Sequence, residues 1–386
     1  MGPTIILDKS SLQSLSQSEI NFLFKHYYVV VTPILIIEIL GDLVKKGSKE
    51  NEVKQLANKL LSHDSQINTY YKPIVISSFR GQKISMDGRA IINGGIPIYA
   101  KNGTQGIFFE EPAETIALRN WQRGIFTSIE ETLAQRWRET TRTLDLEDYK
   151  QKHKELIRNM PMIKNFGELA LFVEDHVSDS EPDIQLSYIN YLMGELSFSQ
   201  RLKDTIYERW LKEKTHLFSN FAPYAFYCFK ANMIFYFGIF SDLISTKATN
   251  KIDLEYLYYL PFCQVFSSGD KLHKNICRLL MRRNQDFVGR DKLKSDLKWL
   301  SEEWDSLDED QKIQRKNDYG NYPPNNHKSI TSQLWEKHMK PWKPGMGNLL
   351  AKMTKVKQQR LVEHIKPLIN AVEEYGKKNK ETESKK

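Results

Sequence analysis

The sequence predicts an α/β protein built on a parallel β-sheet, with a large, mostly helical insertion and a helical C-terminal extension. Two short apolar runs, residues 5–7 and residues 262–267, have the composition of buried parallel strands. Each run is followed by an acidic residue and then by a helical pattern, Asp8 in the first case and Asp270 in the second. At 386 residues the chain is long enough to bury a substantial core, in two domains or in one domain with an insertion.

The amino-terminal part of the chain alternates between strand and helix patterns. Ser10 and Ser11 are suited to cap a first helix, and residues 28–32 form a second β-prone run. A helix with apolar residues all round then carries Glu38, which predicts that this glutamate is buried. Residues 50–61 have the spacing of an amphipathic helix.

Between residues 74 and 110 the pattern changes to short β-prone runs separated by Asp-Gly or Asn-Gly pairs. These pairs begin at Asp87, Asn93 and Asn102, and they predict a small exposed β-hairpin element. From residue 114 to about residue 214 the pattern is helical and densely charged. Its basic residues either face nucleic acid or belong to an ordinary solvated surface, because acidic residues are interleaved with them. The basic residues concerned are Arg119, Arg123, Arg136, Arg138, Arg142 and Lys150.

An apolar core pattern resumes at residues 221–244, where the polar residues Lys230, Asn232 and Asp242 favour a buried helix over a membrane span. The lysine-rich, low-complexity end of the chain predicts a disordered basic tail. The expected organisation is a discontinuous α/β domain, an inserted lobe and a helical C-terminal extension. These cover residues 1–75 with 221–290, residues 76–220, and residues 291–386, respectively.

Acidic residues stand at four places that suit a shared site: Asp8, Glu38, Asp253 and Asp270. Ligands of open α/β sheets gather outside the carboxyl ends of the strands, and a buried glutamate needs a partner. Asp253 is expected near the beginning of the helix that leads to the second strand. Ordinary roles are also open: the aspartates can cap helices or form a turn, and the glutamate can pair with a buried Lys or Arg. Their joint occurrence favours one site.

The same residues resemble a known family. Asp8 after an opening strand, the TPILIIE segment ending at Glu38, and the DLEYLYYLPF and VFSSGDKLH segments with Asp253 and Asp270 are similar to PIN-domain (FEN-like) nucleases. The resemblance covers roughly residues 4–75 and 222–290. It implies a three-layer α/β/α fold around a parallel sheet. It also implies that these four acids hold Mg²⁺ or Mn²⁺ for phosphodiester hydrolysis, with Ser268 in a supporting polar role and RNA favoured over DNA.

Elementary chemistry fits the same residue types. Hard divalent cations prefer carboxylate oxygens and water, and they can activate a water molecule and neutralise phosphate charge. The sequence has no CxxC or HExxH pattern for zinc, no GxxxxGK[ST] phosphate loop and no GxSxG nucleophile elbow. We therefore predict a metal-dependent endonuclease in which Asp8, Asp253 and Asp270 hold the principal ion. Glu38 is expected to complete the shell directly or through water.

Substrate and partner contacts are expected from basic and exposed residues. A helix after Asp270 carries three arginines suited to contact backbone phosphates: Arg278, Arg282 and Arg283. A formal net charge of +8 also favours a polyanionic partner, although much of the excess lies in the C-terminal tail. The three cysteines, all in apolar settings, and the lack of a signal peptide predict reduced core thiols and a cytoplasmic protein with no membrane contact.

A second class of function is open. In it, the chain is a partner-regulated or scaffolding component of a multi-protein bacterial defence or toxin-type complex, with a latent PIN-like domain. The insertion or the C-terminal extension would then contact a protein partner through tryptophans taken to be exposed. The four retained acids argue against an inert scaffold.

Overall fold

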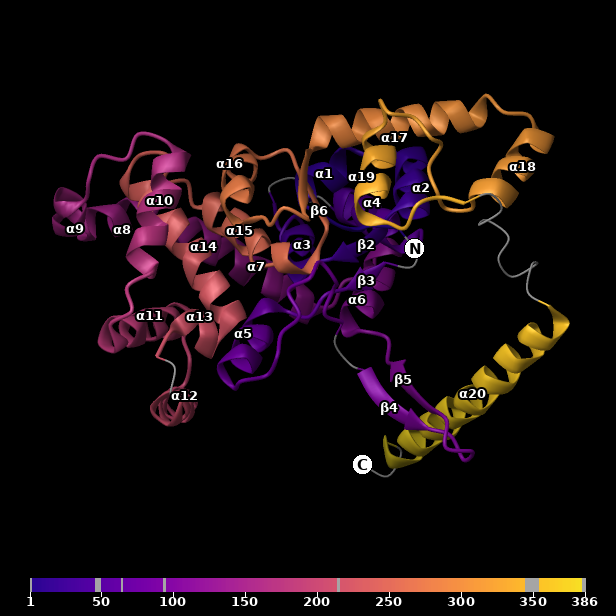
Figure 1. Cartoon of the computed structure of the whole chain (residues 1–386), viewed down its shortest axis with the longest axis horizontal. Helices are drawn as coiled ribbons and strands as arrows, with labels where there is room; N and C mark the ends of the chain where they lie inside the picture. Colours follow the sequence, from indigo (N-terminus) through magenta and orange to yellow (C-terminus); the bar gives the residue numbers. More distant parts are fainter. Residues whose placement is uncertain are drawn as a thin grey trace.

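The computed structural model describes residues 2–45, 50–63, 65–92, 95–213, 216–343 and 354–383. Its centre is a five-stranded, entirely parallel sheet in the order β3-β2-β1-β6-β7. The strands are β1 (Thr4–Leu7), β2 (Tyr28–Val31), β3 (Gln66–Ile67), β6 (Val265–Ser268) and β7 (Asp286–Gly289). Helices lie on both sides of the sheet, consistent with three α/β/α layers (Figure 1). The predicted α/β fold with a parallel sheet is confirmed.

The strand order reverses at the centre of the sheet, between β1 and β6. β1 pairs with β2 on one side and with β6 on the other, so that Ile5 lies opposite both Val29 and Val265. Open parallel sheets leave a crevice at the carboxyl ends of the strands where the order reverses. Asp8 follows β1 directly, and Asp270 follows β6 after one glycine. The topology therefore brings residues from the two ends of the sequence to one edge of the sheet.

Strand β6 is shorter and begins later in the sequence than the predicted run, residues 262–267. A 3₁₀ turn over Leu260–Phe262 has Pro261 as its second residue, and the strand starts only at Val265. Proline has no amide hydrogen and a fixed φ, so it suits the first turn of a helix better than an interior strand position. The apolar residues 260–263 are buried but precede the strand and do not belong to the sheet.

Helix α17 (Arg290–Asp305) belongs to the layer that covers the sheet, although the sequence places it in the C-terminal extension. It packs against α1 (Lys9–Ser14), α2 (Gln17–His26) and strands β6 and β7. Helix α19 (Ile330–His338) packs on α17, and the Trp335 indole Nε1 donates to the His26 carbonyl over 2.8 Å. The covering layer thus extends well beyond residue 290.

The inserted segment begins with a helix and not with a strand. Residues 71–79 form α5 (Tyr71–Phe79), which packs against α14 (Pro223–Phe240), so tertiary burial outweighs the β-prone composition. A two-stranded antiparallel hairpin follows, β4 (Gly95–Tyr99) with β5 (Gln105–Phe109). Its turn contains the predicted Asn102-Gly103 pair, with Gly103 at a φ of +84°. Asp87-Gly88 forms a bend outside any hairpin, and Asn93-Gly94 lies outside the described residues.

The rest of the insertion is helical, as predicted. Its helices are α6 (Ala113–Gln122), α7 (Ser128–Thr143), α8 (Leu146–Lys152), α9 (Lys154–Asn159), α10 (Phe166–Val177), α11 (Pro182–Glu195), α12 (Gln200–Lys212) and α13 (Phe218–Phe221). α6 packs on α4 (Glu50–Leu61), α7 contacts α3 (Pro33–Leu40), and one hydrophobic core runs from the sheet into these helices. The insertion is therefore joined to the α/β unit by a shared core.

Tryptophan exposure differs from expectation. Trp121, Trp210 and Trp335 are buried, and Trp137 packs partly against the core, so these side chains are not available to a partner. Trp342 remains 39% exposed. The three cysteines are all buried and form no disulfide. In the part of the chain that the structure describes, no helix is long and apolar enough to cross a membrane.

The hairpin and the last helix form an arm that stands away from the rest of the molecule (Figure 1). Helix α20 (Lys355–Glu383) packs on β4 and β5, and the rings of Phe108 and Tyr375 lie 6.4 Å apart. The Lys101 ammonium contacts the Glu374 carboxylate at 2.5 Å. Residues 377–383 continue the helix, so the predicted disordered tail is wrong over this range, whereas residues 384–386 lie outside the described residues.

A buried histidine at the end of α2 predicts acid sensitivity. His26 Nδ1 donates to the Asn321 carbonyl over 2.8 Å, and burial, with a smaller contribution from Lys25, lowers the pKa of His26 to about 3. In the unfolded chain this histidine is protonated below pH ~6.5, whereas in the folded chain it stays neutral down to about pH 3. The free energy of unfolding therefore falls as the pH is lowered from ~6.5 to about 3. We expect a loss of about 2 kcal/mol from pH 6.5 to pH 5.

Urea denaturation at several pH values measures this loss. His26→Gln should flatten the pH dependence by about one proton, even though it lowers stability overall. The exposed His327→Gln serves as the matched control and should keep the wild-type slope. An unchanged slope in His26→Gln would contradict the assignment.

Candidate active site

The four predicted acids line one pocket at the carboxyl edge of the sheet. Asp8 and Asp270 come from the ends of β1 and β6, Glu38 comes from α3, and Asp253 comes from α15 (Thr249–Leu257). The pocket has a volume of about 290 Å³. Its complete lining is Asp8, Lys9, Ser10, Glu38, Asp253, Tyr256, Gly269, Asp270 and Arg290.

Asp8 is fixed by local hydrogen bonds as well as by its place in the sheet. Its Oδ1 accepts from the Ser11 amide over 2.8 Å, so Asp8 itself caps α1, as its ordinary role would have it. The prediction that Ser10 or Ser11 caps this helix is wrong, because the helix already begins at Lys9. Its Oδ2 accepts from the hydroxyls of Ser10 and Ser268 over 2.8 and 2.7 Å. The capping role and the pocket-lining role are therefore compatible, because one carboxylate has enough acceptor sites for both.

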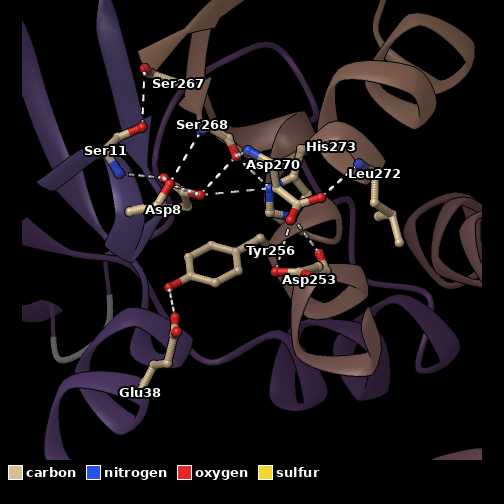
Figure 2. Close-up of polar contacts among 12 residues, drawn as sticks. Asp8, Ser11, Glu38, Asp253, Tyr256, Ser267, Ser268, Asp270, Leu272 and His273 are labelled. Atoms are coloured by element: carbon tan, nitrogen blue, oxygen red, sulfur yellow. Dashed lines mark hydrogen bonds and ion pairs between the residues drawn. The ribbon is translucent and has the colours of Figure 1, made fainter. Parts of the chain in front are cut away.

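Ser268 and the buried His273 connect two of the acids (Figure 2). The Ser268 Oγ lies 2.7 Å from Asp8 Oδ2 and 2.7 Å from His273 Nδ1, and it accepts from the Asp270 amide over 2.9 Å. On the other side of the ring, Nε2 donates to the Asp253 carbonyl over 2.8 Å. This chain of contacts ties the ends of β1 and β6 to α15. Ser268 thus contacts Asp8 directly, and its supporting role at a metal site stays a prediction.

The donors and acceptors around Ser268 can be counted. Nε2 of His273 must carry a hydrogen, because its partner is a carbonyl oxygen that can only accept. Ser268 has one hydroxyl hydrogen and two close acceptors, Asp8 and Nδ1. Both contacts are satisfied together when one further proton is present, on Nδ1 or on Asp8. His273 was not among the predicted site residues. The available signal was its place on the apolar face of α16 (Lys271–Leu280), in register with Ile276 and Leu280.

Glu38 is held by a tyrosine and faces a lysine. The Tyr256 hydroxyl donates to Glu38 Oε2 over 2.7 Å, and Lys9 Nζ lies 4.0 Å from Oε1 (Figure 2 for the tyrosine). Burial raises the pKa of Glu38, against the opposing effects of Lys9 and the Tyr256 hydrogen bond. The sequence suggested that Glu38 either pairs with a buried cation or belongs to an acidic site. The structure shows both features, because Glu38 faces Lys9 and lines the pocket with the other acids.

A buried ionic cluster behind the pocket was not predicted. Lys9 Nζ contacts Asp42 Oδ2 at 2.5 Å and donates to the Glu38 carbonyl over 3.2 Å. The fully buried Asp42 also contacts Lys45 at 2.5 Å and Arg138 at 2.7 Å. Three cations thus surround one carboxylate, and the charge of Lys9 is engaged within the protein.

Part of the proposed basic face of the insertion is used in the same internal way. Arg138 binds Asp42 and the Gly41 carbonyl, Arg119 pairs with Glu111, and Lys150 pairs with Asp242. These contacts favour the interpretation of the segment as a surface with internal ion pairs over a nucleic-acid face. We therefore assign these three residues no role in substrate binding.

Asp253 is the most perturbed acid of the pocket. It is the fifth of the nine residues of α15, so it lies mid-helix and not near the beginning as expected, and it does not cap the helix. Burial raises the pKa of Asp253 to about 8, with further contributions from the charges of Asp270, Glu38 and Asp8. Four acids that repel one another and include no soft ligand suit a hard divalent cation.

The fit to a divalent ion rests on donor type and charge. All four acids present carboxylate oxygens, and Asp253 is destabilised in its charged form when no such ion is bound. Within the described chain, no three His, Cys, Asp or Glu side chains are already close enough to form a complete metal-binding group. The pocket thus gathers oxygen donors of the type that Mg²⁺ and Mn²⁺ prefer, and the binding of either ion stays a prediction.

The arginines assigned to the substrate lie elsewhere. Asp270 caps the beginning of α16, accepting from the Leu272 amide over 2.6 Å, whereas Arg278 lies in its last turn and Arg282 and Arg283 follow its end. Ten helical residues span about 15 Å, so the three arginines lie at the far end of the helix from the pocket. The prediction placed these arginines near the pocket, but α16 begins at the pocket and runs away from it, so residues at its C-terminal end are distant. Arg290, at the end of β7, lines the pocket instead.

The chain matches no protein-family model, no curated protein and no solved structure. The resemblance to PIN-domain nucleases therefore stays a prediction from the sequence. The case for a function rests on the chemistry of the pocket itself.

Proposed function

We propose that this protein is a metal-dependent endonuclease with a PIN-like α/β domain, and that RNA is its favoured substrate. The observation that carries the proposal is the gathering of four carboxylates, Asp8, Glu38, Asp253 and Asp270, around one pocket at the reversal point of the sheet. They come from segments more than two hundred residues apart in the sequence. Helix capping alone does not explain such a gathering, because neither Glu38 nor Asp253 caps a helix.

The residues of the pocket have complementary roles in this proposal. A bound Mg²⁺ or Mn²⁺ would supply charge neutralisation on the phosphate and activation of the attacking water. Asp8, Asp253 and Asp270 provide oxygen ligands, and Glu38 completes the set. Tyr256 orients Glu38 by its hydrogen bond, while Ser268 orients Asp8 in the same manner.

The test is a cleavage assay with purified protein. Labelled single-stranded RNA and DNA of the same sequence are incubated with Mn²⁺, Mg²⁺, Ca²⁺ or EDTA. We expect internal cleavage with Mn²⁺ or Mg²⁺, faster on RNA, and none with EDTA. Asp8→Asn and Glu38→Gln should remove the activity, whereas the exposed Asp305→Asn on α17 should retain it. Cleavage that persists in EDTA, or equally in all variants, would contradict the proposal.

A partner-regulated nuclease is the second candidate, and the arm formed by the hairpin and α20 favours it. Large apolar side chains of this arm are exposed, including Ile107, Leu361, Ile365 and Ile369. Exposed apolar patches of this kind mark interaction surfaces more often than isolated exposed residues do. In this version the chain would be a latent component of a defence or toxin-type assembly. An intact, metal-loaded chain that is inactive alone but cleaves in the presence of its native complex would favour this version.

A further inference from the structure

We propose that Arg290 binds the phosphate group whose ester bond is cleaved. This inference rests on the proposed nuclease function and specifies how the substrate enters the same pocket. A phosphodiester is an anion, and it would enter a space lined by Asp8, Glu38, Asp253 and Asp270. A cation that faces this space, in addition to the metal ion, would lower the repulsion between substrate and site.

Two cationic side chains line the pocket, and they differ in availability. Lys9 has a side chain that is only 7% exposed, and it is engaged by Asp42 at 2.5 Å and by the Glu38 carbonyl at 3.2 Å. Arg290 has a side chain that is 37% exposed. Among the described residues, its one hydrogen bond runs from Nε to the exposed Asp291 carboxylate, over 3.0 Å. The guanidinium has five N–H donors, so the fork of the two terminal nitrogens can serve a ligand.

Backbone geometry places Arg290 beside the two strand-end acids. Arg290 follows β7 directly, just as Asp8 follows β1, so both residues lie at the same edge of the sheet. Its side chain passes over Gly269, the residue between β6 and Asp270. A Cβ at Gly269 would lie 3.1 Å from Arg290 Nη1 and 3.0 Å from Ser10 Oγ, closer than a comfortable contact. The glycine thus allows the guanidinium to approach the acids.

The chemistry of the group selects the class of ligand. Arginine presents a planar fork that matches two oxygens of a phosphate, and such charge-assisted pairs are among the stronger hydrogen bonds. A pocket of about 290 Å³ is at the lower limit for an organic ligand of drug size, so it suits a phosphodiester group better than a whole nucleotide. The contact is therefore to the backbone of a strand and carries no base sequence.

A binding experiment tests the role of Arg290 apart from catalysis. Fluorescence anisotropy with a labelled single-stranded RNA is measured in Ca²⁺ at several salt concentrations, and cleavage is measured in Mn²⁺. We expect Arg290→Gln to weaken binding about ten- to a hundred-fold at low salt. In a plot of log affinity against log salt concentration, the negative slope should become shallower by about 0.7. This is the value for the loss of one phosphate contact on a single strand. Arg290→Lys should restore the slope but only part of the affinity.

The matched control is Lys298→Gln, which removes a positive charge from the exposed surface of the same helix about 12 Å further along. It should bind and cleave as the wild type does. Equal affinity and slope in Arg290→Gln and Lys298→Gln, with folding verified by thermal denaturation, would overturn the assignment while leaving the nuclease proposal intact. A wild-type chain that binds RNA through Arg290 but never cleaves it would overturn the nuclease proposal alone. A chain that neither binds nor cleaves would overturn both.

Discussion

Asp270→Asn is expected to lower the rate of RNA cleavage by about 10³-fold and to leave the melting temperature nearly unchanged. A metal ion provides several kcal/mol of transition-state stabilisation, which corresponds to about this factor in rate. The substitution keeps the shape of the side chain but removes the charge that the ion needs. Asparagine is as good a helix cap as aspartate, so the bond to the Leu272 amide at the start of α16 should survive.

Single-turnover cleavage at saturating RNA and Mn²⁺, combined with thermal denaturation, measures this effect. Asp305→Asn, an exposed Asp-to-Asn change on α17, controls for the loss of one negative charge. Wild-type cleavage by Asp270→Asn would exclude this carboxylate from the ligand set. A large drop in melting temperature would instead mean that the residue is mainly structural.

Asp253→Asn is expected to stabilise the metal-free protein above neutral pH and to weaken its stabilisation by Mn²⁺. Burial and the neighbouring acids raise the pKa of Asp253 to about 8, well above its value in an unfolded chain. The folded state therefore releases this proton less readily, and the wild type loses stability as the pH rises from about 4 to about 8. The variant lacks this loss, so at pH 8 it should gain up to about 5 kcal/mol.

Thermal denaturation from pH 4 to pH 8, with EDTA or with Mn²⁺, separates the two parts of the prediction. In EDTA the advantage of Asp253→Asn should grow with pH and vanish near pH 4. With Mn²⁺ the wild type should gain stability by mass action, and the variant should gain less. A variant that is less stable than the wild type in EDTA at pH 8 would show that the Asp253 carboxylate is favourably paired in the metal-free protein.

The strand ends were predictable because their signals are local. Asp8 and Asp270 each follow a short apolar run and precede a helix, and these neighbours in sequence remain neighbours in the structure. Glu38 was recognisable because a carboxylate on an otherwise apolar helix is unusual. The same local logic failed for Asp253, since its helix begins at Thr249 without a side-chain cap that marks the position.

The remaining features depend on contacts that no local pattern encodes. Lys9 and Asp42 are thirty-three residues apart, and Arg138 reaches them from the insertion, so their cluster appears only in three dimensions. The segment at residues 74–79 has β-prone composition, but packing against α14 makes it helical. Arg278 is nearer to Asp270 in sequence than Arg290 is, yet a helix leads away from the pocket and a parallel strand leads back to it.

The reversal of strand order at the centre of the sheet also governs when the pocket can exist during synthesis. Part of the pocket lining comes from residues 8–38, and the rest, from Asp253 to Arg290, is synthesised more than two hundred residues later. Domains generally fold as units once their parts are present, so β1 must wait for β6 before its end faces another acid. Under the proposed function, nascent chains shorter than about residue 290 carry no assembled nuclease centre, which protects the RNA that surrounds them while the protein is being made.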